Sequence, residues 1–156
     1  MSVSLLPAAD SDKPVIANLI QLYLYDMTEF MPFPVGADGR FEYGFLDRFW
    51  SHPYFIMQGR EIAGMALVVD ECPLTGRAPC WFMAEFFVLK ANRKQGVGKA
   101  ALDLALAAHP GPWHIAVPHA NGAAQAFWGR TLADRSVPPR DIHFDGDDWS
   151  LYAFGA

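Results

Sequence analysis

Apolar side chains recur along this chain with two spacings, one typical of helices and the other of strands. Helical spacing begins near Lys13-Pro14, where proline suits the first helical turn, and continues to about residue 25. Two further helices are predicted, one over residues 100–108, which are almost all strong helix formers, and one from Asn121 through residue 132. A short aromatic helix is also predicted over residues 43–51.

Several short runs rich in aromatic and β-branched residues are typical of strands. Residues 53–57 and 61–70 are predicted to form a hairpin, in which Gly64 indicates a bulge or a close packing contact. Other predicted strands cover residues 3–6, 81–89, 113–117, 142–144 and 149–154. Because strands and helices are mixed rather than strictly alternating, we expect a single α/β (mixed α+β) domain over residues 1–156, with a mostly antiparallel central sheet flanked by helices.

Composition narrows the class of protein. Of the 156 residues, 52% are hydrophobic, which excludes a disordered chain, and no apolar run approaches the ~20 residues of a membrane span. Residues 1–7 lack the basic start and long apolar stretch of a signal peptide, so a cytoplasmic protein is expected. A net charge of −5 argues against general nucleic-acid binding.

The predicted central strand leads into a glycine-containing turn and then into the helix over residues 100–108. This order places a helix N-terminus, with its free backbone N–H groups, beside the end of a strand, which is a favourable anion site. Gly96 and Gly98 would let a phosphate approach those groups closely, because neither residue carries a Cβ atom. Read alone, the turn is equally compatible with a tight strand–helix connection.

The same turn concentrates positive charge. Lys90, Arg93, Lys94 and Lys99 are four of the 12 basic residues in an otherwise acidic chain. A solvated, charged loop is the plain interpretation, but the adjacent glycines favour a site for a polyphosphate.

Two short motifs occur at the glycine turn and downstream of it. Arg93-x-x-Gly96-x-Gly98, which follows a strand ending near Val88, is similar to the coenzyme A motif of the GNAT superfamily of N-acetyltransferases. Asn121-x-x-Ala124-x-x-Phe127-Trp128 is similar to its later motif, an asparagine ahead of a helix that carries an aromatic pair. The motifs occur in the expected order, and the resemblance covers roughly a third of the chain.

The resemblance implies acetyl-CoA as co-substrate, with its pyrophosphate on the glycine turn and its pantetheine arm bonded like an added strand to the main chain near Phe87 and Val88. The five histidines are dispersed and show no ligand-like pair, so no metal is expected. The implied coenzyme-binding residues are Phe87, Val88, Arg93, Lys94, Gln95, Gly96, Val97, Gly98, Lys99, Asn121 and Trp128.

Glu85 is the candidate catalytic residue. It interrupts an otherwise apolar strand, where a carboxylate is costly unless it is paired or functional. Acidic residues often occupy this position in the superfamily, so the resemblance implies that Glu85 faces the acceptor and accepts the amine proton, directly or through water. A structural carboxylate, or one that binds the positive charge of the substrate without proton transfer, is equally compatible with the sequence.

Trp128 departs from the superfamily pattern, in which many enzymes place a tyrosine at this position to protonate the leaving thiolate. An indole N–H is a donor but not a usable acid, so that role would fall to Tyr152 or a water, or the thiolate would leave unprotonated. Trp128 is expected to pack in the core or beside the coenzyme.

Other candidate residues lie outside the two motifs. Asp26 and Glu29 end the first helix, and the corresponding segment lines the acceptor side in proteins that this one resembles, so both are candidates for binding a cationic amine. A solvated helix end is the plainer interpretation. Cys72 and Cys80 flank a turn and are expected to be free thiols.

These observations predict an acetyl-CoA-dependent N-acetyltransferase that transfers acetyl to a primary amine of a small molecule or peptide, by direct attack on the bound thioester. The alternative is a coenzyme A-binding protein with a sensing or regulatory role and little turnover. A purely structural module would bind no coenzyme. Neither nucleic acid nor membrane is an expected partner, and exposed aromatic residues would be compatible with a homodimer.

Overall fold

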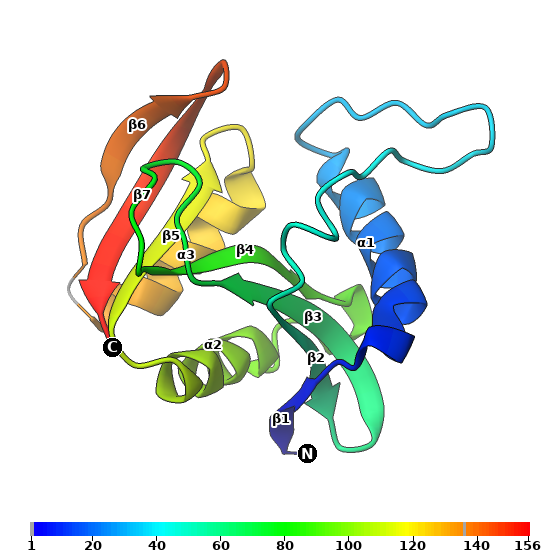
Figure 1. Cartoon of the computed structure of the whole chain (residues 1–156), viewed down its shortest axis with the longest axis horizontal. Coiled ribbons are helices and arrows are strands. Elements are labelled where there is room, and N and C mark those ends of the chain that lie inside the picture. The colour runs from blue at the N-terminus through cyan, green and yellow to red at the C-terminus, as the bar shows by residue number, and fades with distance from the viewer. Residues whose placement is uncertain (1, 136) are drawn as a thin grey trace.

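The computed structural model describes residues 2–135 and 137–156. Within this part of the chain, seven strands form one sheet in the order β1-β2-β3-β4-β5-β7-β6 (Figure 1). The strands are β1 (Val3–Pro7), β2 (His52–Gln58), β3 (Glu61–Val69), β4 (Trp81–Val88), β5 (Pro112–Pro118), β6 (Arg140–Phe144) and β7 (Asp147–Gly155), and the helices are α1 (Lys13–Met27), α2 (Val97–Ala108) and α3 (Gly122–Ala133). Neighbouring strands are antiparallel except β4 and β5, so the predicted mixed α/β fold with a mostly antiparallel sheet is confirmed.

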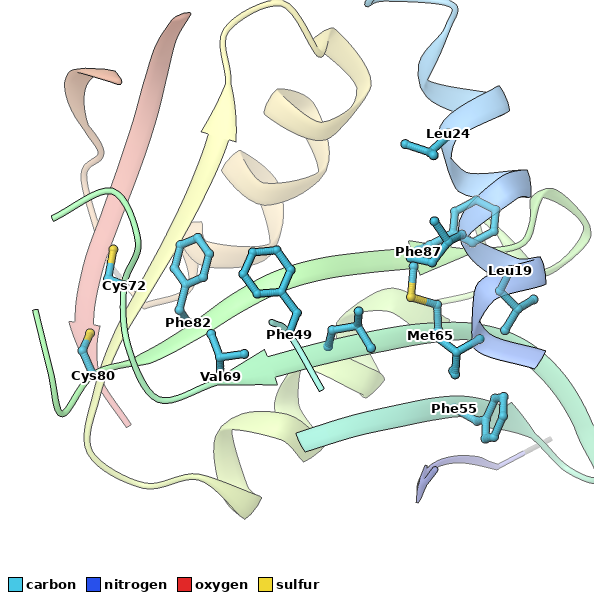
Figure 2. Close-up of a cluster of buried hydrophobic side chains, with 13 residues drawn as sticks. Leu19, Leu24, Phe49, Phe55, Met65, Val69, Cys72, Cys80, Phe82 and Phe87 are labelled. Atoms are coloured by element: carbon cyan, nitrogen blue, oxygen red, sulfur yellow. The ribbon is translucent and has the colours of Figure 1, made fainter. Parts of the chain in front are cut away.

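Different helices cover the two faces of the sheet. On one face, Leu19 of α1 shares a hydrophobic cluster with Met65 of β3 and Phe87 of β4 (Figure 2). On the other face, Leu102 of α2 and Leu132 of α3 share a second cluster with side chains of β4, β5 and β7. We call these the α1-side cluster and the α2/α3-side cluster.

The strands β4 and β5 run parallel but pair only at their beginnings, Trp81 with Trp113 and Phe82 with His114. Beyond these pairs the two strands diverge (Figure 1). The second half of β4 therefore has no neighbouring strand on its β5 side within the described chain, and an extended ligand has room to bond there.

The strand β4 also carries a bulge. Its register against β3 shifts between Met83 and Glu85, which leaves Ala84 as an extra residue. In a regular strand, residues an odd number apart face opposite sides of the sheet. Phe82 and Phe87 nevertheless share the α1-side cluster, because the bulge inserts one residue between them. The same displacement turns Glu85 toward α1.

The β2–β3 hairpin and the bulge at Gly64 are confirmed. The register of β2 against β3 shifts beside this residue. A Cβ atom on Gly64 would lie 1.9 Å from the carbonyl oxygen of Phe87, so only glycine lets β3 approach β4 at this point.

The predicted helix over residues 43–51 is wrong. This stretch forms turns, in which the Phe49 N–H donates to the Phe45 carbonyl at 2.9 Å. Phe49 is buried in the α1-side cluster, and Tyr43 and Trp50 pack against it. Tertiary packing thus replaces local helix formation. No helix in the described part of the chain is long and apolar enough to cross a membrane.

Candidate functional site

A groove of about 670 Å³ opens where β4 and β5 diverge. The C-terminal end of α1, the end of β4, the first turn of α2 and one face of α3 bound it. Its lining includes every residue predicted to bind the coenzyme except Gln95. The two sequence motifs are therefore brought together on one cavity.

The first turn of α2 has the geometry of an anion site. Gly96 is the N-cap, with a φ of +77° in the left-handed region that favours glycine. Among the described residues no side chain caps this N-terminus, so its first N–H groups and the positive end of the helix dipole stay available. Within the described chain, no atom beyond Gly96, its chain neighbours and the adjoining helix backbone lies within 4 Å of the place that a Gly96 Cβ would take, which leaves room for a phosphate.

Gly98 meets a requirement that the sequence did not reveal. A Cβ atom at this position would lie 2.7 Å from Cε1 of Phe127 in α3, closer than carbon atoms can pack. The Phe127 ring also stacks on Phe86 of β4, with ring centroids 5.8 Å apart. Gly98 therefore lets the first turn of α2 pack against α3, and so joins the two motifs.

Most of the positive charge in the turn is already paired. Arg93 Nη2 lies 2.7 Å from Asp26 Oδ2, and Lys90 Nζ lies 3.5 Å from Asp26 Oδ1. Lys99 Nζ lies 3.3 Å from Asp103 Oδ2. Side chains therefore offer a phosphate less positive charge than the sequence suggests, and the backbone N–H groups of α2 contribute correspondingly more.

Arg93 ties the end of β4 to the end of α1. Besides its ion pair with Asp26, its Nε donates to the Val88 carbonyl at 2.9 Å, and its guanidinium lies 5.7 Å from the centroid of the Phe87 ring. Asp26 thus lies beside the turn that leads to Gly96, where Lys90 and Arg93 pair with its carboxylate. Glu29, the other candidate for binding a cationic substrate, is exposed and does not belong to the groove lining.

Gln58, at the end of β2, is hydrogen-bonded to two residues of the turn before α2 and was not predicted to belong to the site. Its Oε1 accepts from Asn92 Nδ2 at 2.7 Å, and its Nε2 donates to Gln95 Oε1 at 3.2 Å. Gln58 itself is buried, and both bonds are partly buried. Its sequence context, a glutamine before the Gly59 turn, gave no sign of these partners.

The helix α3 brings the second motif to the groove. Asn121 caps the helix, because its Oδ1 accepts from the Ala124 N–H at 3.0 Å. Trp128 is buried and packs edge-on against Phe86 and Phe127, with ring centroids 5.2 and 4.9 Å away. This aromatic group forms an apolar wall of the groove.

The remaining candidates lie elsewhere. Tyr152, the alternative acid, is buried in β7 outside the groove lining, and burial raises its pKa. Cys72 and Cys80 are free thiols buried in the α1-side cluster (Figure 2). Among residues 2–135 and 137–156, no three His, Cys, Asp or Glu side chains gather in a way that could hold a metal ion.

Glu85 lies behind the groove, on the α1 side of the bulge. Its carboxyl is deep among protein atoms, although the residue as a whole keeps some contact with solvent. Burial raises the pKa of this carboxyl to about 8, and the neighbouring Tyr23 hydroxyl lowers it in part. Burial, reinforced by the charge of Glu85, raises the pKa of Tyr23 and Tyr43. A carboxyl with a pKa near 8 exchanges its proton close to neutral pH, as a general base must.

A free helix N-terminus beside two diverging parallel strands, with a titratable carboxyl at the strand bulge, is typical of a transferase that uses an acyl-coenzyme. Residues 20–133 match the acetyltransferase (GNAT) family, and the chain belongs to this family of enzymes. The search of curated proteins found no match to the chain.

Solved structures share the fold over nearly the whole chain. A structure from Corynebacterium glutamicum, described as histone acetyltransferase HPA2 and related acetyltransferase, is 22% identical with a TM-score of 0.69, covering 100% of this chain and 98% of that one. An acetyltransferase from Thermus thermophilus is 17% identical, with a TM-score of 0.67 and the same coverage. The yncA protein of Salmonella typhimurium, solved with its cofactor acetyl-CoA, is 13% identical, with a TM-score of 0.64 and coverage of 99% and 94%.

Proposed function

We propose that this chain is an acetyl-CoA-dependent N-acetyltransferase that transfers acetyl to a primary amine of a small molecule or peptide, by direct attack of the amine on the thioester. The observation that carries the proposal is the uncapped N-terminus of α2, with open space over Gly96, at the point where β4 and β5 diverge. Bound acetyl-CoA would supply the thioester whose acetyl group is transferred.

The residues of the groove fit this co-substrate. The first N–H groups of α2, from Val97 onward, would hold the pyrophosphate, aided by the exposed side chain of Lys94. The open edge of β4 near Phe87 and Val88 would bond the pantetheine arm like an added strand. Arg93 must then share or yield the Val88 carbonyl to which it now donates.

Glu85 is proposed as the general base. In its ionised form the carboxylate would take a proton from the amine, directly or through one water, and so free the nitrogen lone pair for attack. Holding the amine beside the thioester would itself lower the barrier by several kcal/mol.

Calorimetric titration of the purified chain with acetyl-CoA tests the coenzyme site. Binding, followed by release of free thiol when primary amines are added, would support the proposal. Absence of binding at millimolar coenzyme would mean that the Gly96 turn is only a connection between strand and helix, and would overturn it.

A second candidate function is coenzyme A binding with little turnover. The observation that favours it is Trp128, which occupies the position where many enzymes of the family have a tyrosine as general acid. Tyr152, the alternative general acid, lies outside the groove lining. Coenzyme binding without acetylated product for any primary amine would support this alternative.

Substitution of Glu85 tests its role. Glu85→Gln should lower turnover by about 100-fold to 10,000-fold while coenzyme affinity changes little, because the amide cannot accept the proton. Glu61→Gln, at an exposed glutamate that begins β3, is the matched control and should leave both quantities unchanged. Equal losses in turnover and coenzyme affinity for Glu85→Gln would indicate a structural carboxylate instead.

A further inference from the structure

The Tyr43 hydroxyl is a buried polar atom without a hydrogen-bond partner in the described part of the chain. Buried polar groups are almost always bonded, and an exception in a native fold needs an explanation, such as a ligand or an ordered water. The ring itself is well held, because it packs on the α1-side cluster and meets the Phe45 ring edge-on, with centroids 5.8 Å apart. The hydroxyl is thus fixed in place with its bonding capacity unused.

The loop that carries Tyr43 is bonded to α1 beside Glu85. The Gln21 side-chain amide donates to the Phe41 carbonyl at 2.9 Å and accepts from the Phe41 N–H at 2.8 Å. Tyr23 lies two residues beyond Gln21, and Tyr43 lies two residues beyond Phe41. This pair of hydrogen bonds holds the loop against α1, and both tyrosines pack against the α1-side cluster.

The bulge of β4 turns Glu85 toward this pair of tyrosines, opposite Leu67 of β3. Tyr23 and Glu85 lie close enough for each to shift the pKa of the other, and Glu85 acts electrostatically on both Tyr23 and Tyr43. The titratable groups that the carboxyl acts on are thus Tyr23 from α1 and Tyr43 from the loop, and its register partner on β3 is the apolar Leu67. One carboxyl and two hydroxyls gather from three separate segments.

The chemistry of the three groups defines the ligand. An ionised carboxylate only accepts hydrogen bonds, and each tyrosine oxygen can accept as well. A ligand with several N–H donors and a positive charge satisfies all of them, whereas an anion would be repelled by the carboxylate.

We propose that Tyr43, together with Glu85 and Tyr23, binds the nitrogen of the acceptor as a primary ammonium group, and that Tyr43 is a specificity-determining residue for it. This assignment rests on the proposed function. The ammonium donates to the Tyr43 oxygen and to the Glu85 carboxylate, then passes one proton to that carboxylate and remains as a neutral primary amine. A tertiary or quaternary amine lacks the donors and leaves the Tyr43 hydroxyl unbonded.

The first test measures the titration of Glu85 by carbon NMR in the full chain, with its signal assigned by loss in Glu85→Gln. Methylammonium should lower the pKa of Glu85, whereas tetramethylammonium, which carries the same charge but no N–H donor, should not do so at equal ionic strength. Tyr43→Phe should bind methylammonium about tenfold more weakly. Tyr25→Phe removes a hydroxyl from an exposed position of α1 and should behave as the wild type.

Equal effects of the two cations, or equal methylammonium binding by wild type and Tyr43→Phe, would overturn the assignment. Thermal unfolding gives an independent readout. Tyr43→Phe should keep or raise the unfolding midpoint, since it removes an unbonded hydroxyl, and a marked fall would show that the hydroxyl has a structural partner. Acetyl-CoA titration of the same proteins is separate: its failure overturns the transferase, while the ammonium response is measured without coenzyme.

Discussion

At the scale of single residues, Glu85 shows how one inserted residue sets the chemistry of a site. If β4 alternated regularly through Ala84, Glu85 would face the α2/α3 side of the sheet together with Met83. The bulge instead directs it into the layer between β4 and α1, where little water reaches the carboxyl. Desolvation then raises its pKa to about 8.

Glu85→Gln should therefore stabilise the protein relative to wild type, and increasingly so as the pH rises from about 5 to about 8. In the unfolded wild type the carboxyl ionises near its ordinary pKa of 4.5, whereas the folded protein retains the proton until about pH 8. Between these values the unfolded state binds fewer protons, so wild-type stability falls with rising pH, by about 1.4 kcal/mol per unit of pKa difference. Urea unfolding at several pH values measures this, and a pH-independent difference would contradict the raised pKa.

At the scale of elements, the site depends on the N-terminus of α2 and the C-terminus of α1, which meet over β4. The N-terminus of α2 presents backbone groups, which a substitution changes only through conformation. Gly96 and Gly76 provide a matched pair, because both have positive φ, +77° and +72°, and neither has an atom near the position of an added Cβ.

Gly96→Ala should weaken acetyl-CoA binding, since the methyl group would enter the space over the helix N-terminus and the left-handed conformation disfavours alanine. Gly76→Ala carries the same backbone strain, about 1 kcal/mol, at a turn outside the groove and should leave coenzyme affinity unchanged. Calorimetric titration of both variants with acetyl-CoA separates the effect of backbone strain from the effect of filling the space over the N-terminus of α2. Unchanged affinity in Gly96→Ala would show that no phosphate approaches this turn.

The end of α1 contributes a carboxylate to a groove proposed for an anion. Asp26→Asn should tighten acetyl-CoA binding by about twofold to fivefold, because it removes a negative charge and releases Arg93 and Lys90 for the phosphates. Asp47→Asn, which removes an exposed carboxylate paired with Lys13, is the control and should have no effect. Weaker binding in Asp26→Asn would mean that the ion pair positions Arg93 for the coenzyme.

At the scale of the whole molecule, the sheet consists of two parts, β1 to β4 and β5 to β7, joined directly by only a short parallel pairing. The helices α1 and α3 belong to different parts and both line the groove between them. A coenzyme in this groove would contact both parts and link them.

Acetyl-CoA should therefore raise the thermal unfolding midpoint. At a concentration about 100 times its Kd, binding to the folded state alone adds about 2.7 kcal/mol of stability, which for a chain of this size is a shift of about 5–10 °C. Differential scanning fluorimetry measures the shift, and Gly96→Ala should show less of it at the same concentration. A midpoint that does not respond to acetyl-CoA would contradict the groove as a coenzyme site.

The sequence by itself determined the features that depend on neighbours in the chain. The strand, turn and helix around Gly96 lie within one continuous stretch, and the spacing of Arg93, Gly96 and Gly98 alone carries the resemblance to a coenzyme A motif. The bulge at Gly64 was readable for the same reason, since a glycine inside an apolar strand is a local signal. The prediction of a helix over residues 43–51 was wrong because the conformation there depends on contacts with distant residues: Phe49 packs in the α1-side cluster.

Only the tertiary structure decided how distant segments meet. Asp26 and Arg93 are 67 positions apart, and their pairing depends on where α1 crosses the end of β4. Gly98 is required by the ring of Phe127 rather than by its own turn. Whether Glu85 would face α1 depended on the register of β4 against β3, which the spacing of apolar residues does not encode. The proposed role of the unbonded Tyr43 hydroxyl depends on its burial and on its proximity to that carboxyl, and both are properties of the folded chain.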